Sequence, residues 1–371
     1  MIQKKIQKGF MLVILIAAAI LTVSPANAVD FAISGQINRA AMYVDDGSTA
    51  KWFFVDNDNS STRFRFTGSN DFENSWKVGI VWEVEMQSNA SNKVNMDVND
   101  TSDVHFDERK LEFWVGHKIG KAWLGQGDMA SNGTAEVDLS GTDVANYSSV
   151  SDVGGSFEFQ DSGDSIVKLD STGAPILDAD GDPVPISVGG SRSNFDGLSR
   201  QDRVRYDTPT FAGFTASGSV AGSSRWDAAL RYAGDFGWAK LAAAGAWADF
   251  GTSSKTDDNR LSTSASMLFD FGLNLTVAYA KQKQDATDPW NIYGKVGYQF
   301  LEKHAASVGW GRTENYSAKD DKGDSVSLAY VFSPWKSVEF YGSYTVHMLD
   351  RDNGSDPDDI NAGFVGGRVK F

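Results

Sequence analysis

Cysteine, proline and long apolar runs are absent or scarce in this 371-residue sequence. The absence of cysteine excludes the disulfide framework that stabilises many small exported domains. Beyond residue 28 no stretch approaches the roughly 18 consecutive apolar residues of a membrane-spanning helix, so helical spans are excluded. The 8 prolines, the 37 glycines and the 12% aromatic content suit a chain of many strands joined by tight turns.

Basic residues are also fewer than acidic residues. Lys and Arg number 34 against 49 Asp and Glu, which gives a formal net charge of −15. A nucleic-acid partner is therefore excluded, because phosphate binding needs clustered basic residues. We also predict no enzyme, because there is no nucleophile elbow or phosphate-binding loop. The four histidines are scattered without the spacing of metal ligands: His105, His117, His304 and His347.

Residues 1–28 have the pattern of a secretory signal peptide. Lys4, Lys5 and Lys8 precede an apolar run over residues 10–23, and Ala26-Asn27-Ala28 forms a small-residue cleavage site. The alternative, a membrane anchor, is disfavoured because the run is shorter than the roughly 20 residues that span a bilayer as a helix. Cleavage removes three lysines and no acids, so the net charge of residues 29–371 becomes −18.

Apolar and polar residues alternate along most of the remaining chain. In residues 76–87 one parity is apolar throughout and the other is largely polar, which predicts a strand with two unlike faces. The same holds for residues 61–68, where two phenylalanines alternate with Arg63 and Arg65. In the first predicted strand, residues 29–44, Arg39 falls on the apolar parity, which indicates either a bulge or a face covered by protein.

The last predicted strand, within residues 358–371, ends on Phe371 and needs a partner along both edges. We expect it to close onto the first strand. Short turns and longer acidic loops alternate along the chain, as they do in bacterial outer-membrane barrels. The sequence therefore predicts an all-β fold, a 16-stranded antiparallel transmembrane β-barrel with both termini on the short-turn side and a water-filled lumen.

Periodicity fails over about 70 residues after residue 128, and loops of that length are functional or disordered. We expect residues 160–198 to be a polar insert in this loop. Its acids Asp178, Asp180 and Asp182 are candidates for calcium, a cation that takes six to eight oxygen ligands, but they lack the spacing of a twelve-residue calcium loop. The alternative is a solvated acidic loop with no metal and no cofactor.

Five stretches resemble the general diffusion porins of Gram-negative bacteria, of the alphaproteobacterial type. They are ISGQINRA (33–40), FVDNDNSSTRFRFTG (54–68), GTAEVDLSGTDVANYSSVSDVGG (133–155), RYDTPTFAGFTASGS (205–219) and the terminal Phe371. The resemblance implies one barrel over residues 29–371 in the outer membrane. It also implies a homotrimer, contact with membrane lipid and lipopolysaccharide, and handling by the barrel-assembly machinery during biogenesis.

In that family the loop after the fifth strand folds into the lumen and sets the pore size. By position this constriction loop is residues 128–159, with Glu136, Asp138, Asp143 and Asp152 as acidic linings. The PEFGG motif of enterobacterial porins is missing from this stretch. The resemblance gives no counterpart for most of the insert that follows.

Four arginines of inward parity are candidates for a basic wall opposite these acids: Arg63, Arg65, Arg203 and Arg205. Opposed acidic and basic walls produce a transverse field that orients dipolar solutes and penalises apolar ones. Alternatively, the arginines form salt bridges that hold the loop still. The predicted function is passive diffusion of small hydrophilic solutes and ions. The alternatives are a channel selective for sugar, phosphate or another anion, and a plugged barrel acting as an adhesin or enzyme.

Overall fold

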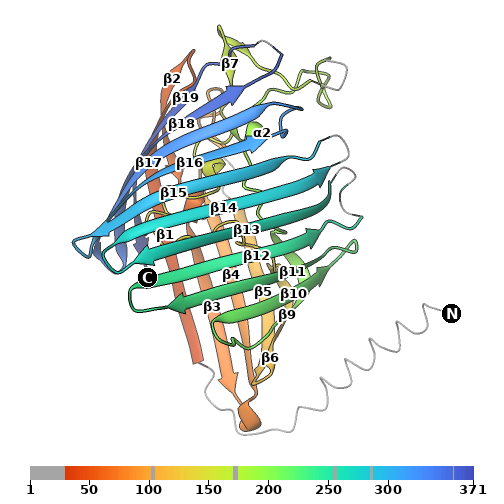
Figure 1. Cartoon of the computed structure of the whole chain (residues 1–371), viewed down its shortest axis with the longest axis vertical. Helices are drawn as coiled ribbons and strands as arrows, with labels where there is room; N and C mark the ends of the chain where they lie inside the picture. The colour runs from red at the N-terminus through yellow and green to blue at the C-terminus, as the bar shows by residue number, and fades with distance from the viewer. Residues whose placement is uncertain are drawn as a thin grey trace, which may run out of the picture.

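The structure, a computed structural model, describes residues 30–371 except for 102–104, 170–173, 253, 255–256, 285–286 and 354. The predicted signal peptide lies outside the described residues. Figure 1 shows tilted strands that surround a central space, with the chain between β6 and β9 visible behind the front strands. No helix in the described part of the chain is long and apolar enough to cross a membrane.

Within these described ranges, one sheet contains 17 strands, and a separate hairpin contains two more. The hairpin strands are β7 (Gln160–Asp161) and β8 (Asp164–Ser165). The sheet strands are β1 (Asp30–Asp45), β2 (Ala50–Asp56), β3 (Arg63–Asp71), β4 (Lys77–Gln87), β5 (His105–His117), β6 (Gly120–Asp128), β9 (Arg200–Asp207), β10 (Phe214–Ala221), β11 (Trp226–Asp235), β12 (Ala239–Asp249), β13 (Asp257–Phe269), β14 (Leu273–Gln284), β15 (Trp290–Phe300), β16 (His304–Glu314), β17 (Lys322–Trp335), β18 (Val338–Asp350) and β19 (Ile360–Lys370).

The second barrel strand is broken into β2 and β3. Both pair with β1, β2 with its C-terminal half and β3 with its N-terminal half, and a short 3-10 helix at Asp58–Ser60 lies between them. Counting these two as one strand gives sixteen, all paired antiparallel, which confirms the predicted barrel. The sequence predicted only residues 61–68 as this strand, but residues 50–56 also pair with β1.

The barrel closes between its first and last strands. β1 pairs with β19 from Gln36 opposite Lys370 to Asp45 opposite Asn361. Phe371 continues this edge, because its backbone N–H donates to Gly35 and its carbonyl accepts from Gly35, at 3.0 and 2.9 Å. Closure therefore pairs the edge that an open terminal strand would expose.

Strand parity separates the two faces of the wall. On β14, Leu275 and Val277 are exposed while the alternating Asn274 and Thr276 are buried. An exposed apolar face and a buried polar face are the reverse of a soluble sheet, and they are the pattern of a barrel that faces lipid outside. Arg39 lies in regular register with Gly367 and Asp56, so no bulge accounts for its outward position.

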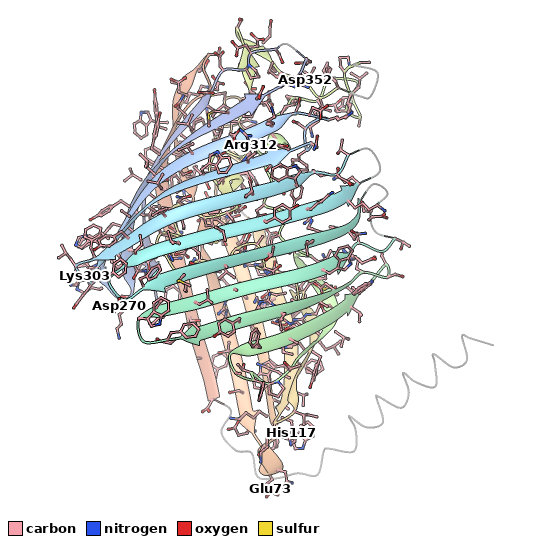
Figure 2. All side chains as sticks on the ribbon, viewed as in Figure 1. Glu73, His117, Asp270, Lys303, Arg312 and Asp352 are labelled. Carbon is pink, nitrogen blue, oxygen red and sulfur yellow. The ribbon has the colours of Figure 1, made fainter. Side chains whose placement is uncertain are left out.

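Connections at the two ends of the barrel differ. At one end the turns are short, such as residues 118–119, 270–272 and 301–303. Figure 2 shows Glu73, His117, Asp270 and Lys303 at this end, and Asp352 at the other. The other end carries the long connections, including the 71 residues between β6 and β9. Two connections at the long-loop end, residues 46–49 and 222–225, are short as well.

Part of the inner wall is apolar, which the simple parity rule did not predict. Met42, Phe53 and Phe364 face inward from β1, β2 and β19, and they pack in one buried cluster with Phe157 and Ile186 from the long connection. Residues 160–198 are therefore not a uniformly polar insert. Ile166, Ile186 and much of the C-terminal part of the insert are buried, whereas residues 162–165 and 174–183 are exposed.

Candidate functional site: a charged cavity inside the barrel

The connection between β6 and β9 lies along the inner face of β13. The backbone N–H groups of Val137 and Leu139 donate to the hydroxyls of Ser264 and Ser266, at 3.0 and 2.9 Å. The Ser264 hydroxyl donates in turn to the Thr134 carbonyl at 2.8 Å. Small side chains let the backbone approach closely, and their hydroxyls satisfy buried backbone groups that would otherwise be unpaired.

A buried ion pair fixes the same segment to the next strands. Lys295 of β15 is fully buried and forms an ion pair with Asp138, and its ammonium also donates to the Asn146 carbonyl at 2.8 Å. Tyr293 donates to the Asn146 side chain at 3.0 Å. Asp138 was predicted to line the pore, but this pairing makes it an anchor of the loop.

Arg192 fixes the other end of the connection. This side chain is 2% exposed and donates to the Gly323 carbonyl at 2.7 Å and to Thr313 at 3.2 Å. Glycine is favoured on the wall here, because a Cβ at Gly323 would lie 2.5 Å from the backbone oxygen of Ser191. The connection is therefore attached to the inner wall at its beginning, middle and end.

A cavity of about 660 Å³ lies between this connection and the opposite wall. Of the predicted site residues, Glu136, Asp143, Asp152 and Arg63 line it together. Five further charged residues line the same cavity and were not predicted: Asp58, Asp196, Arg109, Arg200 and Arg260. The cavity thus combines acids, mainly from the loop, with arginines of the barrel strands.

Arg109 reaches the cavity through a β-bulge. Opposite β4 the register steps from Glu83–Lys110 to Val84–Glu108, which leaves Arg109 as the extra residue. A bulge re-aims a side chain in this way. The sequence carried a faint signal for it, because the apolar parity changes between Phe106 and Leu111, both of which are exposed.

The acids of the cavity are bonded to neutral donors. Glu136 accepts from the Asn194 side chain at 2.8 Å, and Asp152 accepts from Tyr147 and Ser149. Burial raises the pKa of Glu136 to about 8, and the negative charge of Asp196 adds to the effect. Burial raises the pKa of Asp152 to about 7, with a further contribution from Asp58.

The other predicted basic residues lie on the inner wall in ion pairs. Arg65 pairs with Glu83, and Arg205 pairs with Asp207 and also donates to the Met129 carbonyl at 3.1 Å. Arg203 is buried in an ion pair with Glu112, and it donates to the Asp128 carbonyl at 3.0 Å. None of these three is among the residues that line the cavity, and Arg203 and Arg205 contact the start of the loop.

The calcium candidates are exposed residues of the insert, and none of them lines the cavity. The Asp178 carboxylate accepts from the backbone N–H groups of Asp180 and Asp182, both at 2.9 Å, and these bonds lower its pKa. This arrangement is a tight turn in which one carboxylate bonds its own backbone. Within the described ranges, no three His, Asp or Glu side chains are grouped as metal ligands.

Comparison with known proteins supports one family. The model of the Gram-negative porin family matches residues 15–353. A comparison with curated proteins gave no sequence match.

Solved structures share the fold at low sequence identity. The anion-selective porin from Comamonas acidovorans is 15% identical with a TM-score of 0.59, over 93% of this chain and 100% of that one. The outer membrane channel DcaP of Acinetobacter baumannii is 11% identical with a TM-score of 0.58, over 93% and 98%. OmpT of Vibrio cholerae, in its trimer form, is 15% identical with a TM-score of 0.54, over 93% and 100%. With a family match across most of its length and a closed sixteen-stranded barrel, the chain belongs to the Gram-negative porins and forms an outer-membrane channel for solute diffusion.

Proposed function

We propose that this porin is a general diffusion pore, of the alphaproteobacterial type, whose constriction is the cavity between the loop and the wall. The observation that carries this proposal is the cavity itself, which is lined by side chains of both charges. Such a lining suits hydrated polar solutes of many shapes, because field and radius alone select among them. No catalytic step is required, and we propose no cofactor.

A substrate-selective channel would need a continuous row of binding side chains. Two tryptophans of inward parity, Trp114 and Trp123, come closest to such a row. Their rings are covered by the chain's own Lys121, whose ammonium lies 3.8 Å from both ring centres. This internal cation–π contact leaves little aromatic surface for a sugar, which favours the general pore.

Reconstitution in planar bilayers tests the proposal. A general pore gives large ohmic current steps that no single solute blocks. Current blocked by one sugar or by phosphate at low concentration would contradict the general reading in favour of a selective channel. A barrel with no steady conductance would contradict the diffusion pore altogether.

We further propose a homotrimer in which the β1 side of the barrel contacts a neighbouring subunit. Arg39 lies on the outer face between Ile37 and Tyr43, and its partners are Asp56 at 3.6 Å and the Ser88 carbonyl at 2.9 Å. A charged residue on a lipid face costs roughly 2–4 kcal/mol near the midplane, so protein cover is favoured. Conductance steps in groups of three test this contact. We expect these grouped steps to be lost in Arg39→Leu, and also when a bulky thiol reagent modifies an Ile37→Cys variant.

A further inference from the structure

A groove of about 670 Å³ lies on the outer face of the barrel, which meets lipid. The pairing register across β15 to β19 explains it. One row of outward residues, each opposite the next on the neighbouring strand, consists of Tyr298, Ala306, Tyr330, Gly342 and Val365. Large and small side chains therefore alternate along this row, and the groove lies over the small ones.

The groove lies in the half of the wall nearer the short turns. Ala306 is the third residue of β16, and Tyr298 lies two residues before the end of β15, on either side of the turn at residues 301–303. The short turns of outer-membrane barrels lie at the periplasmic surface. The groove is therefore at the depth of the acyl chains of the periplasmic leaflet, which contains phospholipid rather than lipopolysaccharide.

A histidine lies at the turn end of the groove, close to the level of the lipid headgroups. The ring of Tyr330 lines the groove, and its hydroxyl lies 2.7 Å from Nδ1 of His304. His304 also stacks on Phe300 and Phe332, with ring centres 5.3 and 4.8 Å away. When Nδ1 accepts from Tyr330, Nε2 carries a hydrogen and can donate to a phosphate or ester oxygen.

Two exposed lysines lie beyond this histidine. Lys303 is in the turn between β15 and β16, and Lys336 is in the turn between β17 and β18. The backbone N–H of Ser333 donates to the Lys303 carbonyl at 2.8 Å, so the two turns lie side by side. Their only acid is Glu302. Among the described residues neither lysine side chain has an ion-pair partner, so both are available to an external anion.

We propose that the groove binds one anionic glycerophospholipid of the periplasmic leaflet. An acyl chain lies over Ala306 and Gly342, where its methylene groups are buried against apolar side chains. The phosphate is bound by Lys303, Lys336 and Nε2 of His304, because basic clusters at the membrane surface attract anionic headgroups. A neighbouring subunit is the alternative occupant. The lysines favour lipid, because a protein contact that buried them without a counter-charge would be destabilised.

Native mass spectrometry of the folded protein in detergent tests the headgroup site, with phosphatidylglycerol and phosphatidylcholine as probes. We expect phosphatidylglycerol to bind roughly tenfold more tightly, because each surface lysine contributes about fivefold to affinity for an anionic lipid. Lys303→Gln with Lys336→Gln should remove the difference between the two lipids. The matched control, Lys77→Gln with Lys118→Gln, removes two exposed lysines from the same end of the barrel and should keep it.

Filling the groove tests the acyl-chain site. Ala306→Leu with Gly342→Leu should lower the affinity for both lipids at least about fivefold. A Cβ at Gly342 would make only ordinary contacts, the nearest at 3.5 Å, so the barrel should keep its fold. The control Ala243→Leu adds the same bulk to an outward alanine of β12, outside the groove, and should leave both affinities unchanged.

Equal binding of the two lipids by the native protein would overturn the inference, as would a filled variant that keeps its affinities or a control that loses them. If the filled variant lost its trimer mass while its lipid binding was unchanged, the groove would belong to a neighbouring subunit, and the lipid site would be contradicted. None of these outcomes depends on which solutes pass through the pore.

Discussion

The two halves of the inner wall carry different kinds of side chain and have different roles. Along β13 to β16 the inward side chains are mostly small and uncharged, such as Ser262, Ser264, Ser307 and Gly309, and the loop lies directly on them. Along β3 to β9 many are long and charged, and Arg63, Arg109 and Arg200 among them line the open cavity. The first half therefore makes most of the contacts that hold the loop, and the second half supplies three of the four arginines of the cavity.

This division explains why strand charges alone do not identify the lining. Arg203 and Arg63 share inward parity on their strands, yet Arg203 is buried at a pair with Glu112 while Arg63 lines the cavity. Arg203 is buried because a carboxylate and the start of the loop contact it, whereas Arg63 lines the cavity with no such pair among its described contacts. Four changes test the division.

Deletion of residues 133–155 should have the largest effect. If this segment narrows the pore, its loss should raise single-channel conductance roughly twofold or more, because the narrowest section dominates the resistance. Single-channel recording measures this. Deletion of residues 174–183, an exposed part of the insert, is the matched control and should leave the conductance unchanged. Equal single-channel currents from the native protein and the deletion variant would show that residues 133–155 do not narrow the pore.

Loss of the buried cation at the loop's anchor should have the next largest effect. Lys295→Met leaves Asp138 buried without its partner, and such a change costs about 3–5 kcal/mol. We expect lower resistance of the folded protein to heat or denaturant, together with unstable current levels. The double variant Lys295→Met and Asp138→Leu should recover most of the lost stability. If the loss came instead from packing of the lysine methylene groups, the double variant would show no recovery.

Enlarging the small wall should displace the loop at a lower cost. Ser264→Leu adds bulk where the Val137 N–H group and the Thr134 carbonyl bond the wall, and overpacking costs about 1–3 kcal/mol. Channel conductance and unfolding should both change. Ala265→Leu is the control, because the next residue on the strand faces the opposite side. Similar effects of the two variants would contradict the prediction that bulk displaces the loop only when it is added on the inner face.

Changing pH should have the smallest effect. The pKa of Glu136 is raised to about 8 and that of Asp152 to about 7, so both carboxyls become protonated and neutral as the pH falls through these values. The ratio of K⁺ to Cl⁻ permeability should therefore fall as the pH is lowered from about 9 to about 6, and it should recover when the pH is raised again. The Glu136→Gln and Asp152→Asn double variant should show a flat profile over this range.

Sequence reasoning found one part of the site and missed another for a definable reason. The alternation in residues 76–87 and 273–281 depends only on local chemistry, so the strands and their faces could be predicted. Glu136, Asp143 and Asp152 were found through the resemblance of the loop. Asp196 and Arg200 were missed because each gains its role from contacts across more than 60 residues, as in the bond from Gly133 to Asp196.

The sequence by itself determined the strands and their two unlike faces, because alternation every second residue is a local pattern, and the alternation of short turns with long loops predicted a closed outer-membrane barrel. It also determined the strand number and the position of the long loop. Only the tertiary structure decided which charges remain uncancelled in the lumen. That outcome depends on distances of a few ångströms between residues far apart in the chain, such as Lys295 and Asp138, and no local pattern encodes those distances.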